Sequence, residues 1–216
     1  MKIEYALHDI ESNDKVFKET LSKILEYPIQ QISVLPQHLK LVKKVLPKQV
    51  QLSAPIDFPF GTNTDSIRRD MIKFAIDHGV DCVEVVAPNR PLCNRNYTQI
   101  QNEIAGYFNM CVENMVDISY TLEYRRFSFT ALARIAKSLH NNSIFKFYVS
   151  SGNKLDDIHD HIIAINVLQK EAPEATIPYN GNLWLKEHLD LLYESQIKSI
   201  RSRTLNALDI IFNKIA

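Results

Sequence analysis

The stretch "VQLSAPIDFPFGTNTDSIRRDMIKFAIDHGVDCVEVVA", residues 50–87, contains a β-rich run, a segment of helical period and a second β-rich run. The three parts are residues 50–56, 64–78 and 81–87. Asn63 or Thr64 can cap the first amides of the helix, and Gly79 follows its last turn. This order predicts two parallel strands joined by a helix.

The same alternation repeats along the whole chain. The predicted strands are residues 2–7, 31–35, 50–56, 81–87, 116–123, 143–149, 175–178 and 197–201. The predicted helices are residues 13–26, 37–46, 64–78, 97–114, 128–140, 154–171, 183–194 and 204–214. Eight such repeats without a Gly-, Ser- or Pro-rich linker predict an α/β fold, with one domain over residues 1–216 that forms a closed (β/α)8 TIM barrel. The alternative is an open doubly wound sheet, although "FPFGTNT" lacks the glycine spacing of a dinucleotide-binding turn.

Composition excludes several classes of protein. The 25 basic and 25 acidic side chains balance, so no basic surface for nucleic acid or an anionic membrane is predicted. No apolar run approaches the ~20 residues of a membrane span, and the first ten residues do not resemble a signal peptide. The odd set Cys82, Cys93 and Cys111 predicts free thiols and a cytoplasmic location. His159 and His161 would face different sides of a helix, so no metal site is predicted.

The predicted barrel interior is unusually polar. Barrel strands point alternate side chains inward, and in "SIFKFYV" an apolar outer face leaves Lys146 and Tyr148 inside. Branched apolar residues normally fill such interiors, and a buried charge must be paired. We therefore expect Lys146 to pair with Glu84, either as a structural ion pair or as part of a site. The side chains that this reasoning places inside include Glu4, Glu84, Glu123, Lys146 and Tyr148.

Five colinear segments resemble a known family. They are "ISVLPQHLKLVKKVL", "SAPIDFPFGTNTDSIRRDMIKFAIDHGVDCVEVVAPNRPL", "TLEYRRFS", "FKFYVSSGN" and "ATIPYNGNLWLKEHLDLL". Together they are similar to deoxyribose-phosphate aldolase and its class I aldolase relatives. The resemblance implies cleavage or formation of a carbon–carbon bond through a lysine Schiff base, without a bound cofactor. It also implies a second lysine, an aspartate for proton transfer, and a substrate phosphate on loops after the late strands.

Placed on this sequence, the family's pattern changes at both lysines. The nucleophilic lysine falls on Tyr148, four residues before the glycine of "YVSSG", and the second lysine falls on Pro178. The catalytic aspartate falls on Glu84 and an N-terminal aspartate on Glu4, so both acids are kept in a longer form. A cysteine of the second strand falls on Ser33.

Three interpretations stay open for the interior. In the first, the nucleophile has moved to Lys146, two residues before Tyr148, with Glu84 as acid and base and Tyr148 as proton donor. In the second, Lys146 only neutralises the acids, and the barrel binds a phosphorylated metabolite without imine chemistry. In the third, Glu4, Glu84 and Glu123 hold a divalent metal for enolate-type chemistry.

The loops after the late strands predict a site for the phosphate of a small phosphorylated metabolite. Hydroxyls and amides of "VSSGN" precede a helix, "YNGN" offers a glycine, and "RSRT" offers guanidinium groups. The predicted phosphate ligands are Ser150, Ser151, Gly152, Gly181, Arg201 and Arg203. Tyr97 and Tyr107 serve either packing or an oligomer surface, such as that of a homodimer, and the sequence leaves both open.

Overall fold

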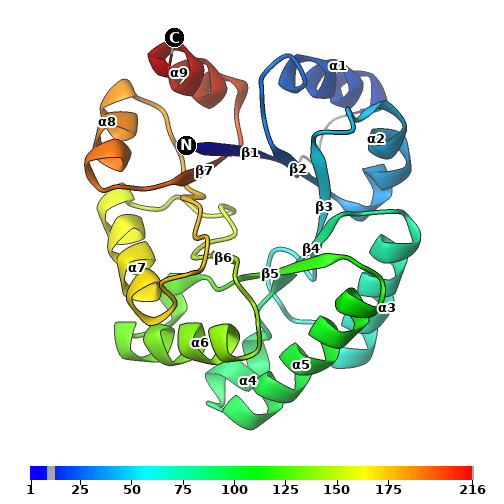
Figure 1. Cartoon of the computed structure of the whole chain (residues 1–216), viewed down its shortest axis with the longest axis vertical. Helices are drawn as coiled ribbons and strands as arrows, with labels where there is room; N and C mark the ends of the chain where they lie inside the picture. The colour runs from blue at the N-terminus through cyan, green and yellow to red at the C-terminus, as the bar shows by residue number, and fades with distance from the viewer. Residues whose placement is uncertain (9–12, 216) are drawn as a thin grey trace.

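The structure is a computed structural model that describes residues 1–8 and 13–215. Seven strands form one sheet in the order β6-β5-β4-β3-β2-β1-β7, and every neighbouring pair is parallel. The strands are β1 (Lys2–Leu7), β2 (Gln31–Val34), β3 (Gln51–Ile56), β4 (Cys82–Val86), β5 (Asp117–Thr121), β6 (Phe147–Tyr148) and β7 (Ser199–Ser202). Figure 1 shows the sheet curled about a central axis with the helices around it. The consecutive order excludes the doubly wound alternative, in which the strand order reverses.

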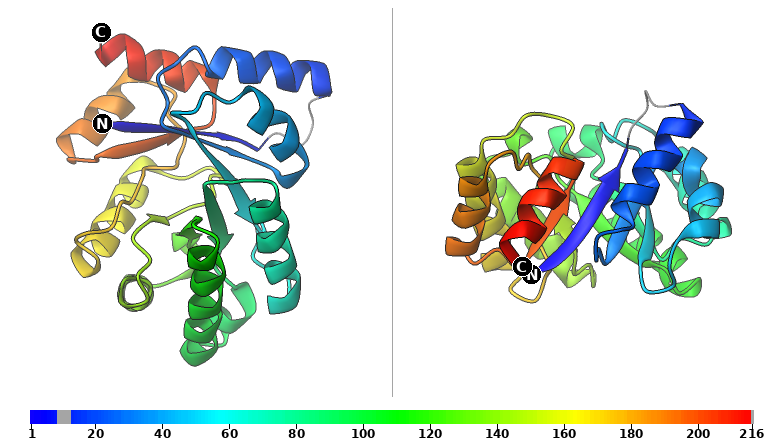
Figure 2. Two further views of the ribbon diagram at one scale, coloured as in Figure 1. Left: turned by 45° about the vertical axis from the view of Figure 1, so that its right-hand side comes forward. Right: turned by 90° about the horizontal axis from the view of Figure 1, so that it is seen from above.

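The helices lie on the outer side of the curled sheet, as both views in Figure 2 show. They are α1 (Asp14–Ile24), α2 (Leu39–Val45), α3 (Asp65–Asp77), α4 (Asn89–Cys93), α5 (Tyr97–Glu113), α6 (Phe129–Asn141), α7 (Ile158–Glu171), α8 (Lys186–Glu194) and α9 (Leu205–Ile215). Two short 3-10 helices precede α2 and α6, at Pro36–His38 and Tyr124–Arg126. The short helix α4 was not predicted, and α7 and α8 begin later than predicted. Among the described helices, none combines the length and the apolar character needed to cross a bilayer.

The unit at residues 50–87 forms as predicted. Helix α3 begins after Thr64, buries Ile72 and Ala75 against the sheet, and ends before Gly79, whose φ of +73° suits glycine. Strands β3 and β4 pair in parallel on either side of it in sequence. Local periodicity and the glycine after the last turn were therefore sufficient to predict this helix, although neither Asn63 nor Thr64 caps it through a side-chain hydrogen bond.

The structure differs from the prediction at two strands, residues 143–149 and 175–178. Only two residues of the first form β6, and the second forms no strand, so the sheet has seven strands rather than eight. Residues 176 and 179 make single parallel bridges instead, to Lys146 and Ile200. Pro178 lies between these bridges and has no N–H to donate to a ladder. The segment links β6 to β7 through hydrogen bonds such as Arg201 N to Tyr179 O, 2.7 Å.

The core has two parts. Outward-facing strand residues such as Ile3, Val83 and Ile200 pack against the helices in the apolar core. The interior of the curled sheet holds buried polar side chains instead, including Gln31, Ser53 and the predicted acids. The three cysteines are free, as the sequence predicted.

Candidate functional site

A buried guanidinium lies at the centre of the interior. Arg201, on β7, is 2% exposed and donates to Glu4 on β1 and to Glu84 on β4. The two bonds to Glu84 are 2.7 and 2.6 Å long, a bidentate arrangement, and the bonds to Glu4 Oε2 are 3.1 and 3.0 Å long. Arg201 was predicted as a phosphate ligand at the end of the last strand. Its guanidinium instead lies in the interior, where the two glutamates bind it.

Lys146 is bound to a different acid from the predicted one. Its ammonium lies 2.6 Å from Glu4 Oε1 and donates to Gln31 Oε1 at 2.6 Å, while Glu84 is held by Arg201. The predicted Lys146 to Glu84 pair is therefore wrong. Lys146 lies just before β6, near the amino-terminal ends of the strands. Its two partners fix this height, because Glu4 pairs in register with Gln31, the first residue of β2.

Tyr148 occupies the place where the family resemblance puts a nucleophilic lysine. Its hydroxyl donates to Glu4 Oε2 at 2.7 Å and receives a hydrogen bond from Arg201, whose guanidinium carbon lies 3.8 Å from the ring centroid. The side chain is fully buried. Burial and the nearby Glu4 and Glu84 raise the pKa of Tyr148 far above its usual value, against the opposing effect of Arg201. The tyrosine therefore stays neutral and fills this position.

The interior charges balance within the cluster. Burial opposes ionisation of Glu84, but the charge and hydrogen bonds of Arg201 outweigh it and lower the pKa of Glu84 to about 2. Arg201 and Lys146 likewise lower the pKa of Glu4 against the effect of burial. Two carboxylates and two cations therefore coexist without net charge, which is the condition for burying them.

Four further side chains complete this network, and the sequence reasoning had named only Ser33 among them. Glu84 also accepts hydrogen bonds from Gln31, Ser53 and Ser33, at 3.0, 2.6 and 3.0 Å. His8, just after β1, lies 2.8 Å from Ser33 Oγ through Nε2. Because Ser33 donates its single proton to Glu84, Nε2 is the donor to Ser33. Period two along β2 and β3 points these polar residues inward, and this signal could have found Ser53.

His8 is held neutral. Burial and the positive charge of Arg203 lower its pKa to about 3. Its Nδ1 atom is buried and has no hydrogen-bond partner among the residues that the structure describes. The ring thus ends a chain of hydrogen bonds that runs from the carboxyl-terminal side of the strands to Glu84.

The loop after β6, which was predicted to bind phosphate, makes its hydrogen bonds to other groups of this chain. Ser151 N donates to Glu123 Oε1 at 2.6 Å, and Gly152 N donates to Ser150 Oγ at 3.0 Å. Ser150 Oγ in turn donates to Asp156 at 2.6 Å. Glu123 adopts a φ of +52°, so it turns away from β5 toward this loop and stays apart from the other acids. The loop amides therefore already have partners.

The glycine of "YNGN" is required by packing. A Cβ at Gly181 would lie 2.6 Å from the Tyr179 hydroxyl. The neighbouring Asn180 donates from its side chain to Ser150 O at 2.8 Å, and its backbone N–H donates to His161 Nε2 at 3.3 Å. This loop therefore braces the one after β6.

Arg203 is the predicted phosphate ligand that stays available. It follows β7, is partly buried, and donates to the Ser151 carbonyl, but no described carboxylate lies within ion-pair distance of it. Burial and the charge of Arg201 lower its pKa to about 10. With His8 and Thr20 it lines a cavity of about 320 Å³ at the carboxyl-terminal end of β1.

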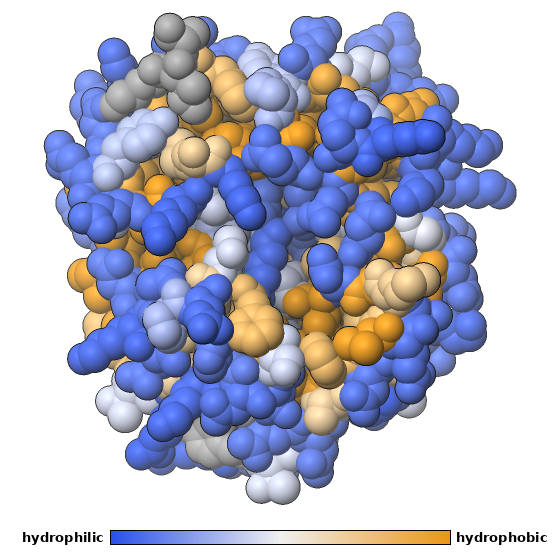
Figure 3. All heavy atoms as spheres, viewed as in Figure 1, coloured by the Kyte–Doolittle hydropathy of each residue, from blue (hydrophilic) through white to orange (hydrophobic). Residues whose placement is uncertain are grey.

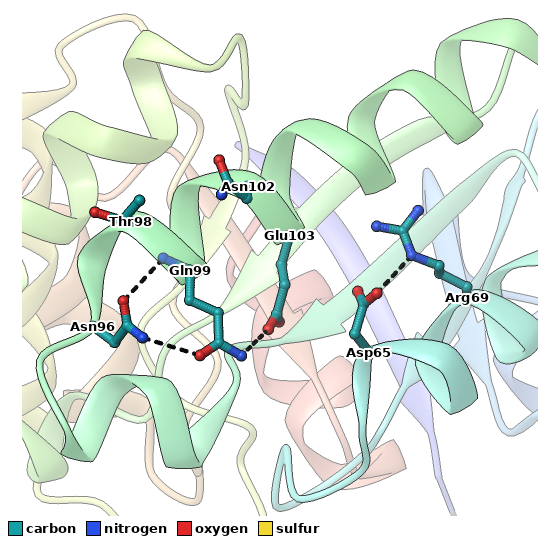
Figure 4. A pocket seen from close by; sticks show the side chains of 7 residues that line it. All are labelled: Asp65, Arg69, Asn96, Thr98, Gln99, Asn102 and Glu103. Atoms are coloured by element: carbon teal, nitrogen blue, oxygen red, sulfur yellow. Dashed lines mark hydrogen bonds and ion pairs between the residues drawn. The ribbon is translucent and has the colours of Figure 1, made fainter.

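Two other arrangements do not form a site. Glu4 and Glu84 share Arg201 while Glu123 binds the loop after β6, and no group of three metal-type side chains that could hold an ion occurs within residues 1–8 and 13–215. A cavity of about 430 Å³ lies outside the ring, between α3 and α5, and its polar side chains bond to one another (Figure 4). Tyr107 is fully buried beside it, under Arg69, which identifies Tyr107 as a packing residue. The Tyr97 side chain lies outside the described residues.

Comparisons with known proteins support the resemblance seen in the sequence. No family model matches the chain. It is 30% identical over 106 residues to deoxyribose-phosphate aldolase of Metamycoplasma arthritidis, covering 49% of this chain and 46% of that protein. It is 25% identical over 122 residues to that of Treponema denticola, covering 56% of each. The chain thus spans about half the length of the curated relatives it matches, and it is a distant relative of these aldolases.

The fold matches over nearly the whole chain. A deoxyribose-phosphate aldolase structure from Aeropyrum pernix superposes with a TM-score of 0.83 at 14% identity, covering 100% of this chain and 91% of that one. A second solved aldolase gives a TM-score of 0.84 at 16% identity, covering 98% and 93%. The curled parallel sheet and its surrounding helices therefore match the fold of these solved aldolases.

Proposed function

We propose, from the likeness to deoxyribose-phosphate aldolases, that this chain is a divergent aldolase-like protein. It binds a small phosphorylated aldehyde or sugar at the carboxyl-terminal end of its strands. In this proposal the segment at residues 175–178 takes the place of the remaining barrel strand, and the single bridges on either side of Pro178 close the ring. The protein is cytoplasmic and acts as one domain, alone or as a homodimer.

One observation carries the binding proposal. Arg203 is a partly buried guanidinium without a described carboxylate partner, and it faces a cavity of about 320 Å³. A buried cation without a counterion is costly, and a phosphate supplies two negative charges and several acceptors. The loop amides are already bound to Glu123 and Ser150, so Arg203 provides the main contact to the phosphate.

The chemical step has two candidates, and the geometry favours binding without an imine. The Lys146 side chain is bound by Glu4 at 2.6 Å, and Tyr148 and Arg201 fill the interior between it and the carboxyl-terminal mouth. An imine requires a neutral amine that a carbonyl carbon can reach. In this candidate the protein senses a phosphorylated metabolite, and its acids serve stability.

The second candidate is a carbon–carbon lyase that works through Lys146. It is favoured by the aldolase relatives and by burial: the Lys146 side chain is 21% exposed, while every other lysine whose side chain is described is an exposed residue. In this candidate Glu84 and Tyr148 carry proton transfer.

Binding is tested by calorimetry with inorganic phosphate and deoxyribose phosphate. We expect both to bind, and Arg203→Met to weaken each by roughly tenfold or more, since a charge-assisted hydrogen bond is lost. Arg134→Met, on the exposed face of α6, is the matched control and should bind as the unmodified chain does. Equal binding by both variants would remove Arg203 from the site.

The chemical step is tested by borohydride reduction with deoxyribose phosphate, followed by mass spectrometry of the peptide that contains Lys146. The binding candidate predicts no adduct and no release of aldehyde. An adduct on Lys146 that Lys146→Met abolishes would instead establish the lyase.

A further inference from the structure

The strands enclose a second cavity at their amino-terminal ends, on the opposite side from Arg203. Its volume is about 270 Å³. Its lining includes the polar residues Gln31, Lys146 and Asp117 and the apolar residues Phe108, Ile118 and Phe145. Figure 3 views the molecule from this side and shows apolar side chains gathered over α3, α5 and the start of β5.

Burial orders these residues from the inner end of the cavity to its opening. Gln31 is 2% exposed and the Lys146 side chain is 21% exposed, so they form the inner end. Phe145 is 46% exposed and Val112, on α5, is 55% exposed, so these two stand at the opening. The cavity therefore leads from an apolar entrance to a polar inner end.

The Lys146 ammonium has a donor to spare at this inner end. An ammonium carries three protons, and Lys146 uses one on Glu4 and one on Gln31. No third oxygen or nitrogen acceptor for it occurs among the described residues, and its other contact is the face of the Tyr148 ring, whose centroid lies 5.6 Å away. A ligand oxygen at the inner end would receive the third proton.

The charge around Lys146 selects the kind of acceptor. The cluster already holds two carboxylates, Glu4 and Glu84, against the cations Lys146 and Arg201. An anionic ligand would add a charge that nothing offsets, whereas a neutral oxygen adds none. The aromatic and branched walls suit an apolar body.

We propose that the amino-end cavity binds a small, neutral, apolar molecule whose single acceptor, a ketone or amide oxygen, receives a hydrogen bond from Lys146. The volume lies just below the roughly 300 Å³ at which pockets for drug-sized ligands begin, so the ligand is small. This site does not depend on the proposed phosphate site, because the two lie at opposite ends of the strands.

The test compares acetophenone with ethylbenzene, which has nearly the same shape but no acceptor. Both are titrated into the full chain and followed by ligand-observed NMR. We expect acetophenone to bind roughly tenfold more tightly, since it gains a hydrogen bond from a charged donor. Equal affinities, or no binding of either compound, would overturn the proposal.

Variants locate the site. Lys146→Met should remove the preference for acetophenone and keep the weaker hydrocarbon binding. Val112→Trp changes an exposed residue at the opening, so folding is preserved, and it should block both compounds. Val45→Trp is the matched control, because Val45 is also 55% exposed and lies on α2.

The result separates this site from the phosphate site. Arg203→Met should leave acetophenone binding unchanged even if it abolishes phosphate binding. Loss of acetophenone binding in that variant, or its retention in Val112→Trp, would place the ligand elsewhere and refute the assignment.

Discussion

The polar and charged groups at the two ends of the strands differ in whether their hydrogen bonds are all made within the protein. At the carboxyl-terminal end the loop after β6 is closed on itself, with Ser151 N bound to Glu123 and Ser150 bound to Asp156. At the amino-terminal end Lys146 keeps one proton for a cavity. Between them lies the Arg201 cluster, in which every charge has a partner.

The difference shows that the two ends of this barrel offer different chemical environments. Aldolase barrels react at the carboxyl-terminal ends of their strands. Here the side chains of Arg201 and Tyr148 fill the space between the carboxyl-terminal end and Lys146. Lys146 instead lines the cavity at the amino-terminal end. The cluster is therefore the structural boundary between the two ends, and the predictions below test it first.

The largest effect is expected from Arg201→Met. This change leaves Glu4 and Glu84 facing each other in the interior without the cation that separates them. Removing one partner from a buried ion pair costs about 3–5 kcal/mol of the free energy of unfolding, which urea denaturation measures. The control Lys73→Met breaks an exposed pair with Asp77 and should change stability by at most about 1 kcal/mol. A similar loss in both variants would contradict a central role for Arg201.

A smaller loss is expected from Lys146→Met, which tests the amino-terminal end alone. Glu4 then keeps Arg201 and Tyr148 as partners, and only the bonds of Lys146 are lost. Because hydrogen bonds to charged groups contribute about 1.5–3 kcal/mol, urea denaturation should show a loss in that range. A loss as large as that of Arg201→Met would mean that the two ends are not separate.

Much of this arrangement could be predicted from local patterns. The β and helical periods located seven strands and eight of the helices, because each depends on neighbours in sequence. The strand at 175–178 failed because Pro178 cannot donate to a ladder, and single bridges replace it. Alternation also placed Glu4, Glu84 and Lys146 inside.

The interaction partner of each buried polar side chain could not be predicted in the same way. Alternation gives the face of a side chain but neither its height nor its position around the ring, so Lys146 was paired with Glu84 instead of Glu4. Arg201 was assigned to a phosphate at the end of the last strand, although Ser199 and Arg201 share the inward face of that strand. The role of His8 depends on Ser33 of another strand, which no local pattern reveals.

Acid should destabilise the carboxyl-terminal half of this arrangement first. The folded-state pKa of His8 and of His161 is about 3, and burial is the main cause for both. The unfolded value is about 6.5, so the unfolded chain binds more protons between these values. Stability is therefore complete above pH 6.5 and falls by up to about 1.4 kcal/mol per pH unit for each histidine below it.

Urea denaturation from pH 7.5 to pH 5 measures this slope. His8→Gln should remove about half of it, whereas His159→Gln, on an exposed residue of α7, should leave it unchanged. A slope that is insensitive to His8 would indicate that this ring is protonated freely in the folded protein.

The smallest effect is expected from Glu123→Gln, at the carboxyl-terminal loop itself. Glutamine keeps an oxygen that can accept from Ser151 N, so the change in the free energy of unfolding should stay below about 1 kcal/mol. The negative charge, however, is lost beside Arg203, which contacts the same serine through its carbonyl. Phosphate should then bind a few times more tightly by calorimetry, because one competing charge is gone. Weaker binding would mean that the carboxylate orders the loop for phosphate rather than competing with it.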